Sequence, residues 1–115
     1  MKKMKPTVSF DDFNKLDLRV GKVLQAFVPE WSQKAIEFKV DFGSEIGQKT
    51  ILAGIKEYVS PKEFIGKNFI FVANLTEKQM GKSVSQGMML MAVDENDKPT
   101  LIKVGARVKP GTIVR

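Results

Sequence analysis

The sequence offers few side chains for covalent or metal chemistry. It has neither histidine nor cysteine, so the usual proton shuttle, thiolate nucleophile and soft metal ligands are missing. Gly81-Lys82-Ser83 ends like a phosphate-binding P-loop, but Thr76 stands where that motif needs its first glycine. Ser85 has no histidine to accept its proton and no nucleophile-elbow motif around it. We therefore expect no enzyme, no cofactor and no metal site.

The stretch from Asn74 to Leu90 has the residue types of a binding surface. It places amide, basic and hydroxyl side chains before a methionine-rich segment, and four of the six methionines fall between Met80 and Met91. Alternation along a strand puts Met89 and Met91 on one face, which we expect to be core. Met88 on the other face is open to an RNA base, a ribose or a peptide. Loops on rigid scaffolds often bind ligands, and we expect Lys78 in such a loop.

The composition predicts one globular domain over residues 1–115. The chain is 43% hydrophobic and 28% charged, and its formal net charge of +6 favours polyanionic partners such as nucleic acid. No apolar run approaches about 18 residues and no signal peptide opens the chain. We therefore expect a soluble, cytoplasmic protein with no membrane insertion.

The apolar pattern predicts short strands and two short helices. Ser9 and Asp12 favour a capped helix through Leu16, and residues 17–28 read as a long bent strand with a bulge at Gly21. Residues 36–42 alternate cleanly, with Glu37, Lys39 and Asp41 on the polar face. Further strands are expected at 49–53, 68–73 and 87–93, and a last short segment at 101–104. Ser60, Pro61 and Glu63 begin the second short helix, which Gly66 ends.

Five strands with a short helix between the third and the fourth is the order of an all-β OB-fold. This fold is a five-stranded Greek-key barrel that commonly binds oligonucleotides. An SH3-like barrel and a small sandwich are the alternatives. Trp31 and Tyr58 lie outside the expected strands. Either ring could stack on an unpaired base or cover one end of the barrel.

Several short motifs, in order, carry a family resemblance over nearly the whole chain. They are Phe13 with Asp17-Leu18-Arg19-Val20-Gly21, then Val40-Asp41 and Gly43, Ala73-Asn74-Leu75, Ser85-Gln86-Gly87-Met88, and Lys109-Pro110-Gly111-Thr112. The sequence resembles the tRNA-binding domain that occurs as free-standing dimers and as the C-terminal part of many methionyl-tRNA synthetases. The resemblance implies an OB-fold homodimer that recognises the shape of tRNA without reading an anticodon.

Other segments resemble the export-related chaperone CsaA of the same family. They are Pro29-Glu30 with Asp41-Phe42-Gly43 and Glu45-Ile46-Gly47, and Lys78-Gln79-Met80-Gly81. Before the Ser-Gln-Gly-Met motif the chain has Lys82-Ser83-Val84, where tRNA-binding members usually carry Gly-Val-Glu. After Ser85 it has Gln86, where the chaperone usually has an acidic residue. The alternative function is therefore a CsaA-like chaperone that binds unfolded peptides in a dimer groove.

The resemblance also implies a set of RNA-binding residues. By position these are Lys34, Ser85 and Met88, and we add Asn74, Lys78 and Gln86 from the same neighbourhood on chemical grounds. Lys34 would bring charge to a phosphate, while Ser85 and Gln86 would hydrogen-bond phosphate or a ribose hydroxyl. The expected partners are tRNA and a second copy of the chain, with unfolded peptides or an aminoacyl-tRNA synthetase as further candidates.

Overall fold

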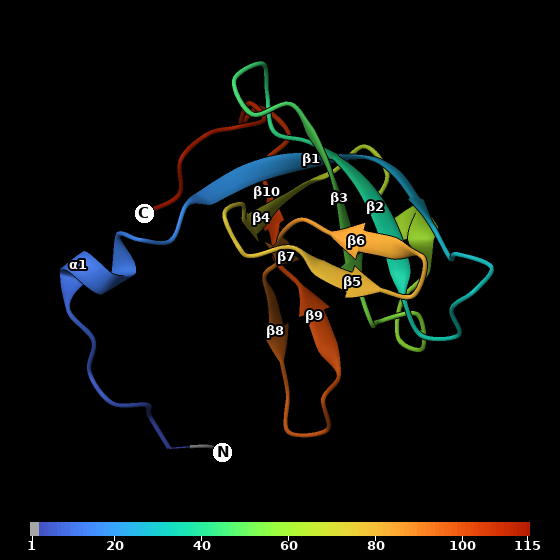
Figure 1. Cartoon of the computed structure of the whole chain (residues 1–115), viewed down its shortest axis with the longest axis horizontal. Coiled ribbons are helices and arrows are strands. Elements are labelled where there is room, and N and C mark those ends of the chain that lie inside the picture. The colour runs from blue at the N-terminus through green and yellow to red at the C-terminus, as the bar shows by residue number, and fades with distance from the viewer. Residues whose placement is uncertain (1–2) are drawn as a thin grey trace.

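The structure, a computed structural model, describes residues 3–115 and is nearly all β (Figure 1). Its elements are α1 (Phe10–Phe13), β1 (Leu18–Phe27), β2 (Ile36–Asp41), β3 (Gln48–Ala53), the 3₁₀ helix η1 (Pro61–Glu63), β4 (Asn68–Val72), β5 (Lys78–Met80), β6 (Ser83–Ser85), β7 (Met88–Met89), β8 (Met91–Val93), β9 (Pro99–Leu101) and β10 (Lys103–Val104). Within the described residues, no helix is long and apolar enough to cross a membrane.

The main sheet closes into the predicted OB-fold barrel. Its strand order is β10-β4-β1-β2-β3, with β7 also paired to β4, and every pairing is antiparallel. The segment just before β7 joins the free edge of β3, because the Gln86 N–H donates to the Thr50 carbonyl at 2.8 Å. Two side chains complete this seam: the Thr50 N–H donates to Gln86 Oε1 at 2.9 Å and the Leu52 N–H to Ser85 Oγ at 3.0 Å.

The predicted alternation of β2 is confirmed by the core. Ile36, Phe38, Val40 and Phe42 are at most 1% exposed. Phe38 meets Phe64 edge-on with ring centroids 4.8 Å apart, and Phe42 meets Phe71 in the same way at 5.2 Å. Such edge-to-face contacts add to the free energy gained from burial. The core therefore lies between the inward face of β1 to β3 and β4.

Gly21 does not form the expected bulge. A Cβ atom there would lie 2.5 Å from Val40 Cγ1 and 2.8 Å from the Phe71 ring, so the position needs glycine for close packing. The bulge in β1 comes later, where the register with β2 shifts between Val23 and Gln25. The close packing at Gly21 and the bulge after Val23 thus occur at separate positions in β1.

The first helix is shorter than predicted, whereas the second keeps to the one or two turns expected. The Ser9 hydroxyl caps α1 by accepting from the Asp12 N–H at 3.0 Å, but α1 ends at Phe13 and not at Leu16. No residue of α1 is buried, so no tertiary packing extends it. The second helix is the single turn η1, begun by the Ser60 N–H, which donates to Glu63 Oε2 at 2.7 Å.

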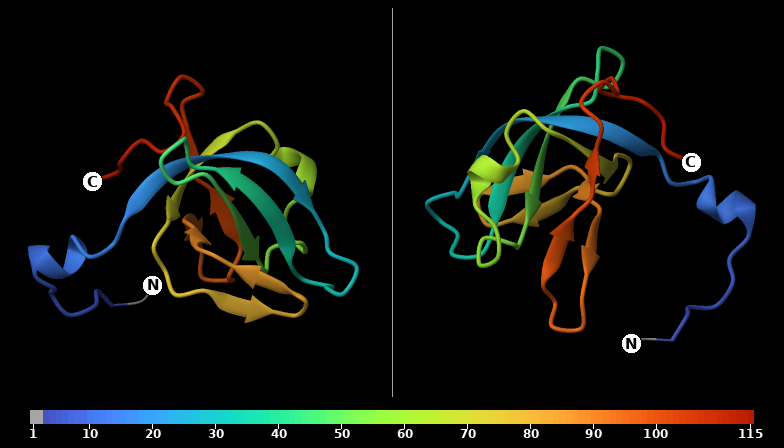
Figure 2. Two further views of the ribbon diagram at one scale, coloured as in Figure 1. Left: turned by 45° about the horizontal axis from the view of Figure 1, so that its top comes forward. Right: turned by 180° about the vertical axis from the view of Figure 1, so that it is seen from behind.

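The expected fifth strand is divided in two by an excursion. β7 ends at Met89, the Leu90 N–H donates to the Ile70 carbonyl at 2.9 Å, and the chain then leaves the barrel as the β8–β9 hairpin. It returns as β10 on the same edge of β4. Figure 1 and Figure 2 show this hairpin projecting away from the barrel. A second hairpin, β5–β6, occupies residues that were expected to form a loop.

Candidate nucleic-acid interface

The β5–β6 hairpin is held firmly against the barrel. Ser83 Oγ donates a hydrogen bond to Glu37 Oε1 of β2 at 2.6 Å. At the turn, Gly81 has a φ of +59° and the Trp31 ring packs on it so closely that a Cβ atom would lie 2.3 Å from the ring. Gln79 Nε2 donates to the Gly81 and Ser83 carbonyls and tightens the turn. The hairpin therefore forms a fixed wall beside the end of β3.

An apolar groove of about 360 Å³ runs between this hairpin, the end of β3 and β7. Leu52, Leu75, Met80 and Met88 supply much of its apolar lining, and Lys78 and Ser85 contribute polar groups. Three of the six predicted binding residues, Lys78, Ser85 and Met88, are thus brought together. The groove offers an apolar surface with one cation beside it.

Four methionines, Met80, Met88, Met89 and Met91, line the groove, and the last two also pack in or against the core. Met88 is 52% exposed, whereas its neighbour Met89 is 4% exposed and belongs to the core. Met91 is half-buried and packs against the same core. The prediction that Met89 and Met91 serve the core is confirmed, and Met88 presents its thioether to the groove.

The three uncharged polar residues among those predicted, Asn74, Ser85 and Gln86, are already hydrogen-bonded inside the protein. Ser85 is 5% exposed, and besides accepting from Leu52 its hydroxyl donates to the Gly87 carbonyl at 3.2 Å. Gln86 Nε2 donates to Glu77 at 3.1 Å. Asn74 lies outside the groove, where it accepts from the Asp17 N–H and donates to the Lys15 carbonyl, both at 2.7 Å. Direct RNA contact by these side chains stays a prediction.

Lys34 stands apart from the groove. It is exposed in the loop between β1 and β2, and its carbonyl accepts from the Lys56 N–H at 2.9 Å. Lys78 is exposed at the start of β5. Lys34 lies on the β1–β2 loop and Lys78 on the β5–β6 hairpin, so they would contact different parts of a large polyanion.

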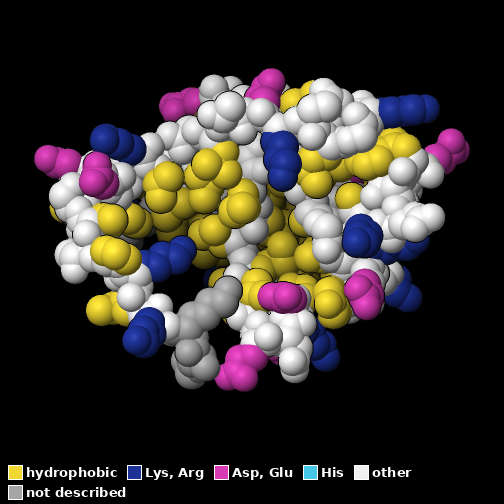
Figure 3. Space-filling model, turned by 60° about the horizontal axis from the view of Figure 1, so that its bottom comes forward, with side chains coloured by type: hydrophobic (Ala, Val, Ile, Leu, Met, Phe, Trp, Pro, Cys, Tyr) yellow, Lys and Arg dark blue, Asp and Glu magenta, His cyan; other side chains and the backbone are white. Residues whose placement is uncertain are grey.

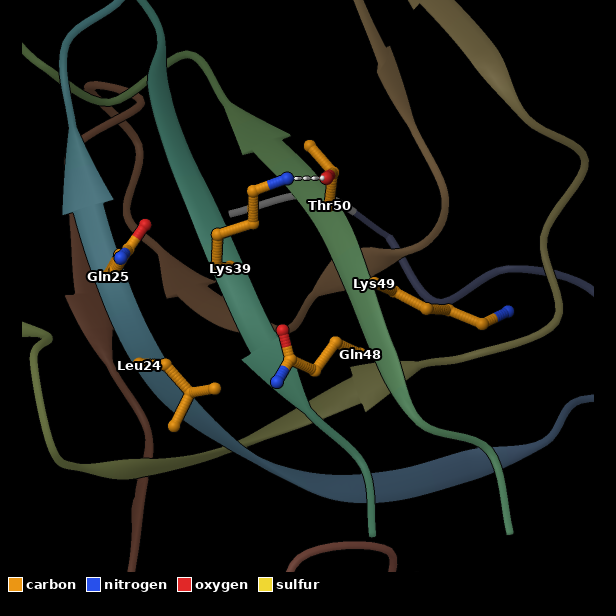
Figure 4. Close-up of a pocket in the computed structure, with 6 residues that line it drawn as sticks. All are labelled: Leu24, Gln25, Lys39, Gln48, Lys49 and Thr50. Carbon is orange, nitrogen blue, oxygen red and sulfur yellow. Dashed lines mark hydrogen bonds between the residues drawn. The ribbon is translucent and has the colours of Figure 1, made fainter. Parts of the chain in front are cut away.

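A second surface is formed by the outer face of β1 to β3 (Figure 4). Gln25, Lys39, Gln48 and Thr50 line a shallow polar depression there together with Leu24. Lys39 Nζ donates to Thr50 Oγ1 at 2.8 Å, which holds the ammonium group over the face. This is the face that OB-folds commonly use for oligonucleotides.

Arg19 has a structural role near the start of β1. A hydrogen bond to the Asp17 carboxylate, 2.6 Å from Arg19 Nε to Oδ1, raises the pKa of Arg19 above its ordinary value. The same guanidinium donates to the Gly111 carbonyl at 2.9 Å and so fixes the C-terminal segment. Across residues 3–115, no group of three acidic, histidine or cysteine side chains is placed to hold a metal ion.

Two features of this region could not be expected from the sequence pattern. Glu37 belongs to the polar face of β2, yet it is 8% exposed because the β5–β6 hairpin covers it. Trp31 and Gly81 are fifty positions apart in the sequence and pack together. Gly81 itself is the local sequence signal for a tight hairpin turn there, because glycine readily adopts the positive φ, +59°, that this turn has.

Comparisons with known proteins agree on one family. A family model described as "Putative tRNA binding domain" matches residues 18–113. The chain is 47% identical over 108 residues to a methionine–tRNA ligase of Chromobacterium violaceum, covering 91% of the chain but 15% of the ligase. A crystal structure of a MetRS-related protein from Pyrococcus horikoshii superposes with a TM-score of 0.91 at 37% identity, covering 96% of this chain and all of that one. The chaperone CsaA of Bacillus anthracis gives 0.85 at 30% identity, with coverage of 96% and 100%.

Proposed function

The chain belongs to the tRNA-binding domain family, and from this premise we propose that residues 1–115 act as one non-catalytic domain that binds tRNA as a homodimer. The family match over residues 18–113 carries the proposal. The net charge of +6 supports it, because phosphate neutralisation supplies most of the affinity for nucleic acids. Recognition rests on the shape and backbone of folded RNA and not on an anticodon.

In this function Lys78 and Met88 contact the RNA directly from the groove, and Lys34 contacts it from the loop before β2. Lys34 and Lys78 neutralise phosphates, while the exposed Met88 thioether packs on a base or ribose. Ser85 and Gln86 fix the groove wall through their bonds to β3. Asn74 ties the start of β1 to the end of β4 in the same way.

An apolar face supports the homodimer. Phe13, Leu16 and Ile113 are 39–57% exposed where α1 and the C-terminal segment come together. Figure 3 shows apolar side chains gathered over a hollowed face on one side of the molecule. Two-fold association would cover the same patch on both copies. It would also double the formal charge from +6 to +12.

The relatives suggest where such a protein works. The chain spans about 15% of the length of the methionine–tRNA ligases it matches. An aminoacyl-tRNA synthetase, as a partner or as the remainder of a longer chain, is therefore part of the proposal. The cytoplasm, where tRNAs are charged and used, is the corresponding location.

The test compares binding of the purified protein to total tRNA and to unstructured RNA of equal length at about 50 and 200 mM salt. Affinity that depends on phosphate contacts falls strongly over this range. We expect tighter binding to folded tRNA, with affinity that falls as salt rises. Equal, weak binding to both RNAs would contradict recognition by shape. Sedimentation of the free protein at the same salt concentrations tests the dimer.

A CsaA-like chaperone is the second candidate, and the apolar groove favours it. Leu52, Leu75 and Met80 would hold an extended apolar peptide against Met88. For this function Met88→Ser should weaken the binding of such a peptide, with little dependence on salt. Met4→Ser is the matched control, because Met4 is 94% exposed and does not line the groove. Peptide affinity that survives Met88→Ser would remove the groove from this function.

A further inference from the structure

A second pocket lies at the far end of the outer sheet face, between the β1–β2 loop and the β5–β6 turn. Its lining includes Phe27, Trp31, Glu37, Lys82 and Ser83. It shares no residue with the apolar groove described above. The loop and the turn lie side by side in both ribbon views, in keeping with the contact of Trp31 on Gly81 (Figure 1, Figure 2). The pocket therefore combines two aromatic rings with two carboxylates, the exposed Glu30 and the nearly buried Glu37.

The carboxylate of Glu37 lines this pocket, which is unusual in a protein with a net positive charge. It is 8% exposed, and Ser83 Oγ holds its Oε1 atom at 2.6 Å. Among the described residues, no other hydrogen bond or ion pair reaches this carboxylate, and Lys82 lies in the same pocket without pairing with it. A buried carboxylate gains most when its remaining oxygen accepts hydrogen bonds. Glu37 Oε2 and the second lone pair of Oε1 are therefore available for a ligand with two N–H donors.

The aromatic partners suit a flat ligand. Phe27 lies directly opposite Glu37 in the β1–β2 ladder and is 41% exposed, while Trp31 is half-buried and fixed on Gly81. Aromatic side chains stack on unpaired bases, and a carboxylate accepts hydrogen bonds from base edges. Guanine is the RNA base with two adjacent donors, N1–H and N2–H₂, on its Watson–Crick edge. The corresponding edges of adenine, cytosine and uracil each place an acceptor beside their donors, which a carboxylate repels.

We propose that this pocket binds an unpaired guanine of RNA, with Glu37 reading its N1–H and N2–H₂ donors and Phe27 and Trp31 holding the ring. The proposal rests on the proposed RNA-binding function and adds base selectivity to it. Lys82 lies at the pocket, where it neutralises a neighbouring phosphate. Gln25 and Lys39 form the next outward pair of the ladder, two residues or about 7 Å along the strands, and continue the path over the face in Figure 4.

The experiment uses hexauridylate RNA in which one uridine is replaced by guanosine, inosine or adenosine. Trp31 is the only tryptophan, so its fluorescence reports binding at the pocket. We expect guanosine to bind tighter than adenosine by about 5- to 150-fold, the range for one bidentate base contact. Inosine, which lacks the N2 amino group, should fall between them. Equal affinities for the three RNAs would overturn the proposal.

Glu37→Gln tests the assigned reader. The glutamine oxygen still accepts from Ser83, but its NH₂ group faces the guanine donors. We expect loss of the guanosine preference with unchanged affinity for unmodified hexauridylate. Glu30→Gln is the matched control on the exposed rim of the pocket and should keep the preference. Loss of the preference in Glu30→Gln alone would assign the reading to the wrong carboxylate and overturn the proposal.

Two further results separate this inference from its premises. N-acetylarginine amide that binds in a Glu37-dependent way, with no guanosine preference, would overturn the proposal and indicate a cation pocket for a protein partner. A guanosine preference without a preference for folded tRNA would support the pocket and contradict the proposed tRNA function. A preference for folded tRNA with no guanosine preference would support the proposed tRNA function and overturn the guanine pocket.

Discussion

The two hairpins beside the fifth barrel strand differ in how they are held. The β5–β6 hairpin bonds to β2 through Ser83, carries Trp31 on its turn and continues into the seam with β3. The β8–β9 hairpin is a ladder of three residue pairs whose turn is closed by its own Asp94, which accepts from the Asn96 and Lys98 N–H groups. The base of this hairpin, at Met91 and Leu101, packs against the core.

The difference separates a hairpin that positions several residues of both pockets from one that contributes Met91 at its base to the groove. Both are short antiparallel ladders, but β5–β6 places Lys78 and Met80 at the groove and Lys82 and Ser83 at the second pocket. The uncharged polar side chains of this hairpin hydrogen-bond within the protein, so its charged and sulfur-containing residues are the ones left to contact a ligand. Three substitutions test this contrast, from the largest expected effect to the smallest.

Gly81→Ala should have the largest effect. The added methyl group meets the Trp31 ring and the backbone keeps a positive φ, so we expect a loss of roughly 2–4 kcal/mol in the free energy of unfolding. Denaturant unfolding with Trp31 fluorescence measures it. Gly105→Ala is the control, because a Cβ atom there has open space and an ordinary φ. Similar losses in both variants would show that the β5–β6 turn has no special role.

Ser85→Ala should weaken the seam. It leaves the N–H of Leu52 without its acceptor in a buried place, which costs about 1–3 kcal/mol of unfolding free energy. Urea denaturation measures this change, and hydrogen exchange at the Leu52 amide should accelerate. Thr100→Ala, on the exposed face of β9, serves as the matched change and should stay close to wild type. A stable Ser85→Ala protein with weakened tRNA binding would instead assign the hydroxyl to the ligand.

Lys78→Ala should change binding and not stability. Loss of one phosphate contact should weaken tRNA binding and lower the slope of log affinity against log salt by about 0.9. The measurement is a salt titration of tRNA affinity beside a thermal melt. Lys98→Ala removes the same charge from the β8–β9 hairpin and should leave the slope nearly unchanged. Equal slopes for the two variants would mean that the charge of Lys78 acts only through the overall positive potential of the protein and not through a specific phosphate contact.

Elements with one buried face were predictable, and elements held by distant partners were not. The alternation of residues 36–42 identified β2 because apolar and polar side chains face opposite ways. The run from Lys78 to Ser85 has no such alternation, since its hairpin is fixed by Glu37 and Trp31 far away in the sequence. The same reasoning placed a bulge at Gly21, where in fact Val40 and Phe71 require the absence of a side chain.

The candidate site shows the same limit for polar side chains. Residue type identified Ser85 and Gln86 as good hydrogen-bonding groups, which they are, but not that β3 lies within reach of them. Lys78 and Met88 are exposed and line the groove, so they remain available to a ligand. Knowing which polar groups are available to a ligand therefore required the fold itself.

The seam between β3 and residues 85–86 also bears on how the protein behaves at high concentration. One backbone hydrogen bond and two side-chain hydrogen bonds, and not a full ladder, cover the outer edge of β3. If the β5–β6 hairpin lifts, the N–H and carbonyl groups of a long, partly apolar strand become an open edge, and such edges recruit strands from other molecules. Changes that loosen this hairpin should therefore appear first as aggregation.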